Sequence, residues 1–177
     1  MVLETLHSVI EKLDSIQIPY MLSGSVAMSY YTVSRSTRDI DFVVHLELDK
    51  VDAMQSLFKD DYFNKDSVIT EIKRRGMFNV ILHNSAFKID FILVKNDEFG
   101  KLEFERRRLI YDFDKPIYIV SVEDLILNKL KWIQQIFSDK QLSDIENLIL
   151  GNQLDMEYLK IQIAKLQLNT FELFENE

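Results

Sequence analysis

Residues 39–44 read DIDFVV, a run rich in residues that favour β-strands. Successive side chains of a strand point to opposite faces, so Asp39 and Asp41 share one face while Ile40 and Phe42 share the other. Two carboxylates held side by side repel each other unless a cation lies between them. The pattern therefore predicts a strand whose polar face binds a divalent cation, Mg²⁺ or Mn²⁺. The alternative is a frayed strand end with two solvated aspartates.

A second strand pattern offers a third carboxylate. Residues 87–93 read FKIDFIL, and the central triplet IDF repeats the triplet at residues 40–42. If the apolar side chains of this strand face the core, Asp90 lies on its polar side. On a strand next to residues 39–44, Asp90 would complete the site of Asp39 and Asp41. By itself, Asp90 is an even choice between a site residue and a surface residue.

A turn of small residues precedes this pair of strands. Residues 23–25 read SGS, between an apolar run at 20–22 that suits a buried strand and a helix expected over 26–31. Exposed backbone N–H groups at a helix start suit a phosphate group. Gly24 and Ser25 are therefore candidate phosphate-binding residues.

The remaining pattern predicts a mixed sheet covered by helices. Helices are expected over 2–16, 49–60 and 97–108, strands over 77–82, 87–94 and 117–120, and no regular structure is assigned to 61–76. The two strands around residue 84 are expected to form a hairpin. The fold class is therefore α+β, a mixed sheet flanked by helices.

The C-terminal third is predicted to be helical. Ser121 and Ser138 each begin a capping-box pattern, and Gly151 is expected to end the second helix in a left-handed conformation. Trp132 is expected in the core, and a last helix is expected over residues 155–169. We therefore divide the chain into a core of residues 1–120 and C-terminal helices of residues 121–177, packed on the core as one compact domain.

Bulk composition narrows the class of protein. The chain has 177 residues, 47% of them hydrophobic, a formal charge of −8 and no cysteine. Binding nucleic acid mainly by phosphate neutralisation usually requires an excess of basic residues, which is absent here. Cysteine-based zinc sites and thiol nucleophiles are excluded. No apolar run could cross a membrane, and no signal-peptide pattern opens the sequence, so a cytoplasmic protein is expected.

Taken together, these motifs resemble the DNA-polymerase-β-like nucleotidyltransferase superfamily, and most closely its AbiEii toxin-type branch. The resemblance rests on Gly24 and Ser25, on Asp39 and Asp41 within RSTRDIDF at residues 35–42, and on a third acidic residue, Asp90. It implies a nucleotidyltransferase-like mixed sheet flanked by helices, with a helical C-terminal extension. It also implies metal binding by the three aspartates and nucleotide binding by the turn.

The AbiEii-type branch carries a lysine and an aspartate on two later helices. Lys129 and Asp144 match these positions, so the resemblance implies that Lys129 contacts nucleotide phosphates and that Asp144 orients it or transfers a proton. Arg35 and Arg38 would offset charge on phosphoryl oxygens, or instead pair with nearby carboxylates. Without the resemblance, Lys129 is an exposed helix lysine and Asp144 an aspartate favoured by the helix dipole.

The function expected from the sequence is Mg²⁺-dependent transfer of a nucleoside monophosphate from an NTP to a hydroxyl of RNA, tRNA included, or of a protein. Two alternatives remain open at this stage. One is a nucleotide-binding module with little catalysis. The other is a toxin–antitoxin component that binds an antitoxin or another partner chain through the apolar C-terminal helix. The apolar residues of this helix, Ile161, Ile163, Leu166 and Leu168, could instead cover the chain's own core.

Overall fold

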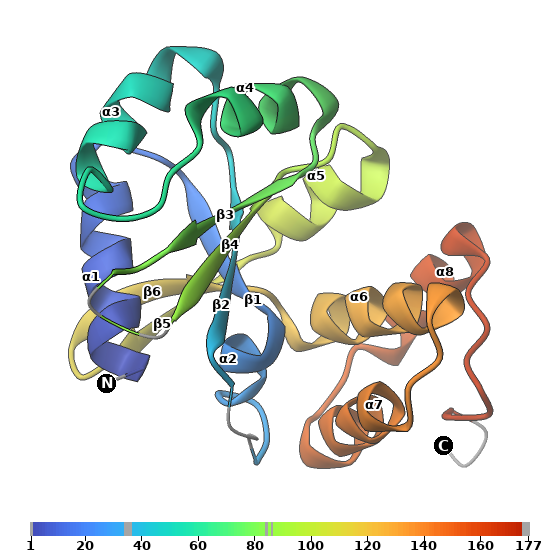
Figure 1. Ribbon diagram of the computed structural model, residues 1–177. Coiled ribbons are helices and arrows are strands. Elements are labelled where there is room, and N and C mark those ends of the chain that lie inside the picture. Colours follow the sequence, from blue (N-terminus) through green and yellow to red (C-terminus); the bar gives the residue numbers. More distant parts are fainter. Residues whose placement is uncertain (1, 34–36, 84, 86, 175–177) are drawn as a thin grey trace. The chain divides into compact units, whose positions relative to one another are not determined.

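A computed structural model of the chain describes residues 2–33, 37–83, 85 and 87–174 (Figure 1). The chain forms two compact units, which are described separately. The first unit comprises Met1–Ala27 and Arg35–Val120, and the second comprises Met28–Ser34 and Ser121–Glu177. None of the described helices is long and apolar enough to cross a lipid bilayer.

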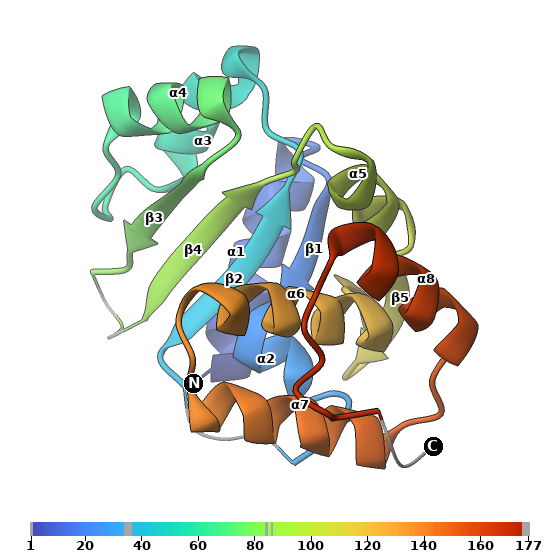
Figure 2. The same cartoon turned by 90° about the vertical axis from the view of Figure 1, so that its right-hand side faces the viewer.

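The first unit is built on a six-stranded mixed sheet with the order β3-β4-β2-β1-β6-β5. Its strands are β1 (Tyr20–Ser23), β2 (Asp39–Val44), β3 (Met77–Ile81), β4 (Lys88–Leu93), β5 (Arg108–Asp112) and β6 (Lys115–Ile119). β2 runs parallel to β4 and antiparallel to β1, and β1 runs parallel to β6. Figure 2 shows β3, β4, β2 and β1 side by side in that order. The expected α+β class and mixed sheet are confirmed.

Helices surround this sheet in the first unit. They are α1 (Val2–Ser15), α2 (Gly24–Met28), the 3₁₀ turn η1 (Leu48–Lys50), α3 (Val51–Leu57), α4 (Lys65–Arg74) and α5 (Glu98–Glu105). In Figure 2, α1 runs behind β1 and β2. The residue after α3, Phe58, packs against Phe91 of β4, whose ring stacks on Phe42 of β2 at 5.9 Å between centroids. These aromatic contacts form the centre of the core.

The alternation of β2 and β4 separates this core from a polar face. Ile40, Phe42, Ile89 and Phe91 are completely buried. Because neighbours along a strand face opposite ways, the residues between them point to the other side of the sheet. Period two thus places Asp41 on the face opposite the aromatic core, and Asp90 with it.

Two elements of the first unit differ from the sequence expectation. Residues 65–74, assigned no regular structure, form α4, which Asn64 caps by accepting a hydrogen bond from the backbone N–H of Ser67 at 3.0 Å. The helix expected over 97–108 ends at Glu105, and β5 begins at Arg108. β5 and β6 form a hairpin that turns at Phe113 and Asp114, both with positive φ, 46° and 63°.

The described part of the second unit contains three helices, α6 (Val122–Gln135), α7 (Asp139–Gly151) and α8 (Met156–Leu166). The expected cap at Ser121 is present, because its hydroxyl accepts a hydrogen bond from the Asp124 backbone N–H at 3.2 Å. Burial of Ile145, Leu148 and Leu159 gives this unit its own apolar core.

Three expectations for the second unit are wrong. Trp132 is 54% exposed, because it follows Asn128 by one helical turn on the less buried side of α6. Ser138 precedes α7 without making a side-chain cap. Gly24 is the one glycine with a positive φ among the described residues, so Gly151 is not left-handed. The side-chain amide of Asn152 instead donates to the carbonyl of Leu148 and closes this end of α7.

Candidate active site

Asp39, Asp41 and Asp90, which we call the carboxylate row, lie across two parallel strands of the first unit. The register pairs Asp41 directly with Asp90 and pairs Asp39 with Lys88. Paired residues of neighbouring strands point to the same face, so Asp41 and Asp90 stand next to each other. The other neighbour of Asp41 across the sheet is Ser23, the last residue of β1.

The members of the carboxylate row differ in burial and in partners. The Asp39 side chain is 55% exposed, whereas that of Asp90 is 9% exposed. One carboxylate oxygen of Asp90, Oδ1, is buried and accepts no hydrogen bond. A buried carboxylate oxygen without a donor is costly. This oxygen could therefore accept a positively charged ligand.

Lys88 brings a positive charge to the carboxylate row. Its Nζ lies 2.9 Å from Asp90 Oδ2 and 3.6 Å from Asp39 Oδ1. The hydrogen bond to Asp90, followed by the negative charges of Asp90 and Asp39, raises the pKa of the Lys88 ammonium. Lys88 therefore stays protonated at neutral pH. Sequence reasoning missed this residue because a lysine two positions before a strand aspartate has no distinctive pattern.

Gly24 packs directly against Asp41. A Cβ built on Gly24 would stand 2.0 Å from Asp41 Oδ2, and the residue has φ +63°. Both the close approach and the left-handed backbone require glycine. Gly24 begins the short helix α2 immediately after β1, and Ser25 follows it with a half-buried side chain. The small-residue turn is thus brought against the carboxylate row.

The arginines before β2 are only partly described. Arg35 lies outside the described residues. Arg38 is exposed, and its backbone carbonyl accepts a hydrogen bond from the Lys88 N–H at 3.1 Å. This bond joins the start of β2 to the start of β4, so the Arg38 side chain leaves the sheet at the same end as Asp39.

Lys129 and Asp144 form an ion pair within the second unit. Lys129 Nζ lies 2.8 Å from Asp144 Oδ2, and the two side chains are 8% and 7% exposed. The same ammonium donates to Gln141 Oε1 at 2.9 Å. The expectation that Lys129 is an exposed helix lysine is therefore wrong. We call Lys129 and Asp144 the buried pair.

The described residues contain no closed metal site. Within residues 2–33, 37–83, 85 and 87–174, no three acidic or histidine side chains are gathered so as to hold a metal ion. The residues nevertheless fit a cation, because carboxylate oxygens suit Mg²⁺ and Asp90 Oδ1 is buried without a donor. The carboxylate row is therefore a set of candidate ligands in which Lys88 holds two of the three carboxylates.

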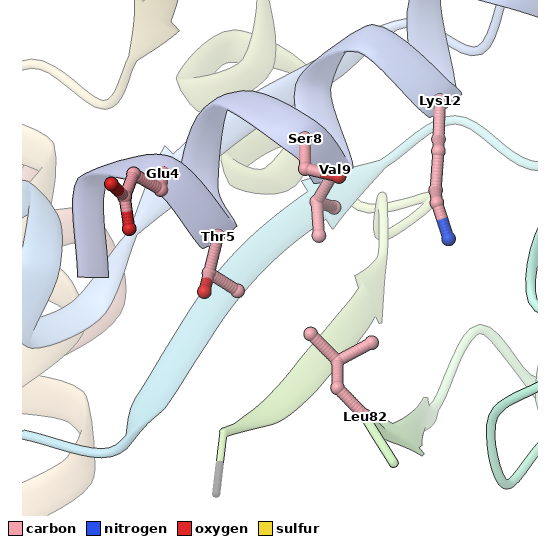
Figure 3. A pocket seen from close by; sticks show the side chains of 6 residues that line it. All are labelled: Glu4, Thr5, Ser8, Val9, Lys12 and Leu82. Carbon is pink, nitrogen blue, oxygen red and sulfur yellow. The ribbon is translucent and has the colours of Figure 1, made fainter. Parts of the chain in front are cut away.

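A hollow of about 230 Å³ lies elsewhere in the first unit, between α1 and the segment after β3 (Figure 3). Its lining residues are Glu4, Thr5, Ser8, Val9, Lys12 and Leu82. The Lys12 ammonium donates to the Leu57 carbonyl at 2.8 Å and so holds α1 to α3. No member of the carboxylate row lines this hollow, and its lysine serves the packing of two helices.

Solved structures of nucleotidyltransferases share this fold. A crystal structure of ANT(2")-Ia in complex with adenylyl-2"-tobramycin matches with a TM-score of 0.62 and 14% identity, over 93% of this chain and 95% of that one. The lincosamide antibiotic adenylyltransferase LnuA, lincomycin-bound, matches with a TM-score of 0.57 and 14% identity, over 84% and 97%. An antigenic nucleotidyltransferase-like protein from Paracoccidioides brasiliensis matches with a TM-score of 0.52 and 18% identity, over 92% and 88%.

These likenesses establish the fold class. The chain has a nucleotidyltransferase-like fold. Nothing in them singles out the AbiEii branch. No protein-family model matches the sequence, and no curated protein matches it significantly.

Proposed function

We propose that the protein is a Mg²⁺-dependent nucleotidyltransferase, which moves a nucleoside monophosphate from an NTP to an acceptor hydroxyl. The acceptor oxygen forms a bond to the α-phosphorus, the bond to the pyrophosphate breaks, and the hydroxyl proton is released. One observation carries this proposal beyond the fold: Asp41 and Asp90 stand side by side on parallel strands, with Gly24 packed against Asp41.

The carboxylate row would hold the metal. The candidate ligands are Asp39, Asp41 and Asp90. The Oδ1 of Asp90 is buried without a hydrogen-bond donor, so a metal ion would give it a partner. A bound Mg²⁺, or Mn²⁺, supplies charge neutralisation of the triphosphate and lowers the pKa of an attacking hydroxyl. Asp39 is the most exposed of the three, so it is the carboxylate that approaching nucleotide phosphates reach first.

The turn at Gly24 and Ser25 would bind the phosphates of the NTP. Gly24 lacks a side chain, so its backbone can approach a phosphate closely. Ser25 adds a hydroxyl one residue into α2. Arg38, at the edge of the row, would offset charge on phosphoryl oxygens, and we propose the same for Arg35.

For Lys129 and Asp144 we propose the roles that an AbiEii-type enzyme assigns to them. The 2.8 Å ion pair supports the part of this proposal in which Asp144 orients Lys129. Lys129 would then present its ammonium to nucleotide phosphates, and Asp144 would hold it in place or accept a proton. The relationship to the AbiEii-type branch depends on these two residues.

Two classes of acceptor follow from different observations. The sequence resemblance favours a hydroxyl of RNA, such as tRNA, or of a protein. The fold likeness adds a small-molecule hydroxyl, because ANT(2")-Ia is matched along 95% of its length in a structure that contains adenylyl-2"-tobramycin. A nucleotide-binding module and an antitoxin-binding component of the same fold remain the non-catalytic alternatives.

The deciding experiment is a transfer assay with each labelled NTP and Mg²⁺. The acceptors are total tRNA, lysate protein, tobramycin and lincomycin, and the matched control is Asp41→Asn. We expect label on one class of acceptor with the unchanged chain, and a loss of at least about a hundredfold in Asp41→Asn with the fold retained by circular dichroism. NTP binding without transfer would support the module, and full activity in Asp41→Asn would refute the site.

A further inference from the structure

Lys88 occupies a defined place beside the carboxylate row. It is the first residue of β4, paired in register with Asp39 and two residues before Asp90. Because strand side chains alternate with period two, Lys88 and Asp90 point to the same face. The ammonium reaches both carboxylates, at 3.6 Å from Asp39 and 2.9 Å from Asp90. A cation of the chain itself therefore lies among the candidate metal ligands.

The charges and oxygens of this cluster are divided unequally. Lys88 contacts two carboxylates of the row, those of Asp39 and Asp90. It contacts Asp90 through Oδ2, whereas the Oδ1 of Asp90 is buried and accepts no hydrogen bond. This buried oxygen remains available to a divalent cation. The side chain of Lys88 is 40% exposed, so its flexible stem can swing away from the row.

We propose that the Lys88 ammonium competes with a divalent cation for the carboxylates of the active site. A metal ion must either share these carboxylates with Lys88 or displace it, so Lys88 keeps metal affinity low until nucleotide binds. This inference rests on the proposed function, since it concerns the same metal. NTP phosphates offer the ammonium a new partner, so nucleotide binding releases Asp90 for the metal. Lys88 is accordingly a positioning residue that couples the binding of metal to that of nucleotide.

A purely structural salt bridge makes a different prediction. If Lys88 only joined β4 to β2, its removal would lower stability and leave metal affinity unchanged. If Lys88 competes with the metal, its removal raises metal affinity whatever happens to stability. Metal affinity therefore separates the two roles without any measurement of catalysis.

The test is a titration of the full chain with Mn²⁺ in the absence of nucleotide. Binding is measured by calorimetry or by the electron paramagnetic resonance signal of free Mn²⁺. The variants are Lys88→Met and Lys88→Gln, which remove the charge, and Lys88→Arg, which keeps it. We expect the two neutral variants to bind Mn²⁺ about tenfold more tightly than the unchanged chain, a typical coupling between sites. Lys88→Arg is expected to bind like the unchanged chain.

A nucleotide arm sharpens the outcome. A non-hydrolysable NTP analogue should raise Mn²⁺ affinity more in the unchanged chain than in Lys88→Met, because that variant has no competitor left to release. A gain in Mn²⁺ affinity smaller than about threefold in Lys88→Met relative to the unchanged chain, both measured without nucleotide, overturns the inference, because threefold is near the limit of a measurable coupling. Equal Mn²⁺ binding in all chains would overturn it while leaving the proposed function standing. Absence of Mn²⁺ binding from every chain, with or without nucleotide, would refute the metal-dependent function as well.

Discussion

The carboxylate row and the buried pair handle charge in opposite ways. In the row, the Lys88 ammonium contacts the carboxylates of Asp39 and Asp90, and Asp90 Oδ1 has no donor. In the buried pair, one ammonium meets one carboxylate and one amide oxygen inside the second unit. The row keeps one buried carboxylate oxygen without a donor, whereas the ammonium of the pair has two acceptors in the second unit. This difference agrees with the proposal that the row binds a ligand, whereas the charges of the pair also hold helices together.

Gly24→Ala should show the largest effect on the row. Its methyl group would overlap the Asp41 carboxylate, 2.0 Å away, at a backbone with φ +63°. We expect activity to fall at least about a hundredfold, because a shift of about 1 Å at a reacting centre has that effect. Unfolding free energy should fall by about 1–3 kcal/mol. Gly151→Ala is the matched control, since its Cβ would meet nothing closer than 3.6 Å. Equal activity of the two variants would contradict the close contact.

Lys129→Met should show the largest effect on stability. It leaves Asp144 buried without its counter-ion, and removal of one partner of a buried pair costs about 3–5 kcal/mol. Urea unfolding measures this loss. The double variant Lys129→Met with Asp144→Leu should recover part of it, and Lys140→Met, at an exposed position on α7, should change little. A single variant as stable as the unchanged chain would show that the pair does not hold the helices.

Asp41→Asn should raise the unfolding free energy measured by urea unfolding, whereas Lys129→Met should lower it. Removal of one of three neighbouring negative charges relieves repulsion, so the metal-free chain should gain about 0.5–1 kcal/mol in unfolding free energy, as active-site residues often conflict with stability. Urea unfolding in EDTA is the measurement, with Asp49→Asn outside the row as control. A loss of stability would mean that Asp41 is a structural residue rather than a binding one.

Glu71 gives a smaller prediction, on pH dependence. Its carboxylate accepts hydrogen bonds from Arg74 Nε at 2.7 Å and the Met77 N–H at 3.0 Å, and the bond from Arg74 is the main cause of its lowered pKa. A lowered pKa means that the stabilisation is present above the unfolded-state pKa, about 4.3, and is lost as pH falls through the folded-state value. Glu71→Gln should lower the melting temperature by about 2 °C at pH 7. At pH 3 the difference should shrink, and a constant difference would contradict the lowered pKa.

Most of the first unit could be predicted because its strands alternate clearly. The period of two at Asp39, Ile40 and Asp41, with the same triplet around Asp90, was sufficient to place the strands and their polar residues. β5 was missed because the basic residues at 106–108 continue a helical pattern, and only pairing with β6 makes residues 108–112 a strand. Local pattern does not reveal which strands pair.

The candidate site was less predictable than the fold. Asp41 and Asp90 carry a recognisable motif, but Lys88 acquires its importance only from the register that brings it to Asp39. Trp132 was misplaced because a large apolar residue on an amphipathic helix suggests burial, and its exposure depends on which side of α6 is covered. The buried pair was suggested by resemblance alone, since its partners are 15 residues apart.

The register between β2 and β4 has a consequence for how this gene can change over time. Asp90 stands beside Asp41 because it lies two residues after Lys88, just as Asp41 lies two residues after Asp39, the partner of Lys88. One residue inserted between Lys88 and Asp90 would point the aspartate toward the aromatic core and a neighbouring hydrophobic side chain toward water. Insertion or deletion of one residue within β4 should therefore be selected against, so the strand should conserve the phase of its alternation as strictly as its aspartate.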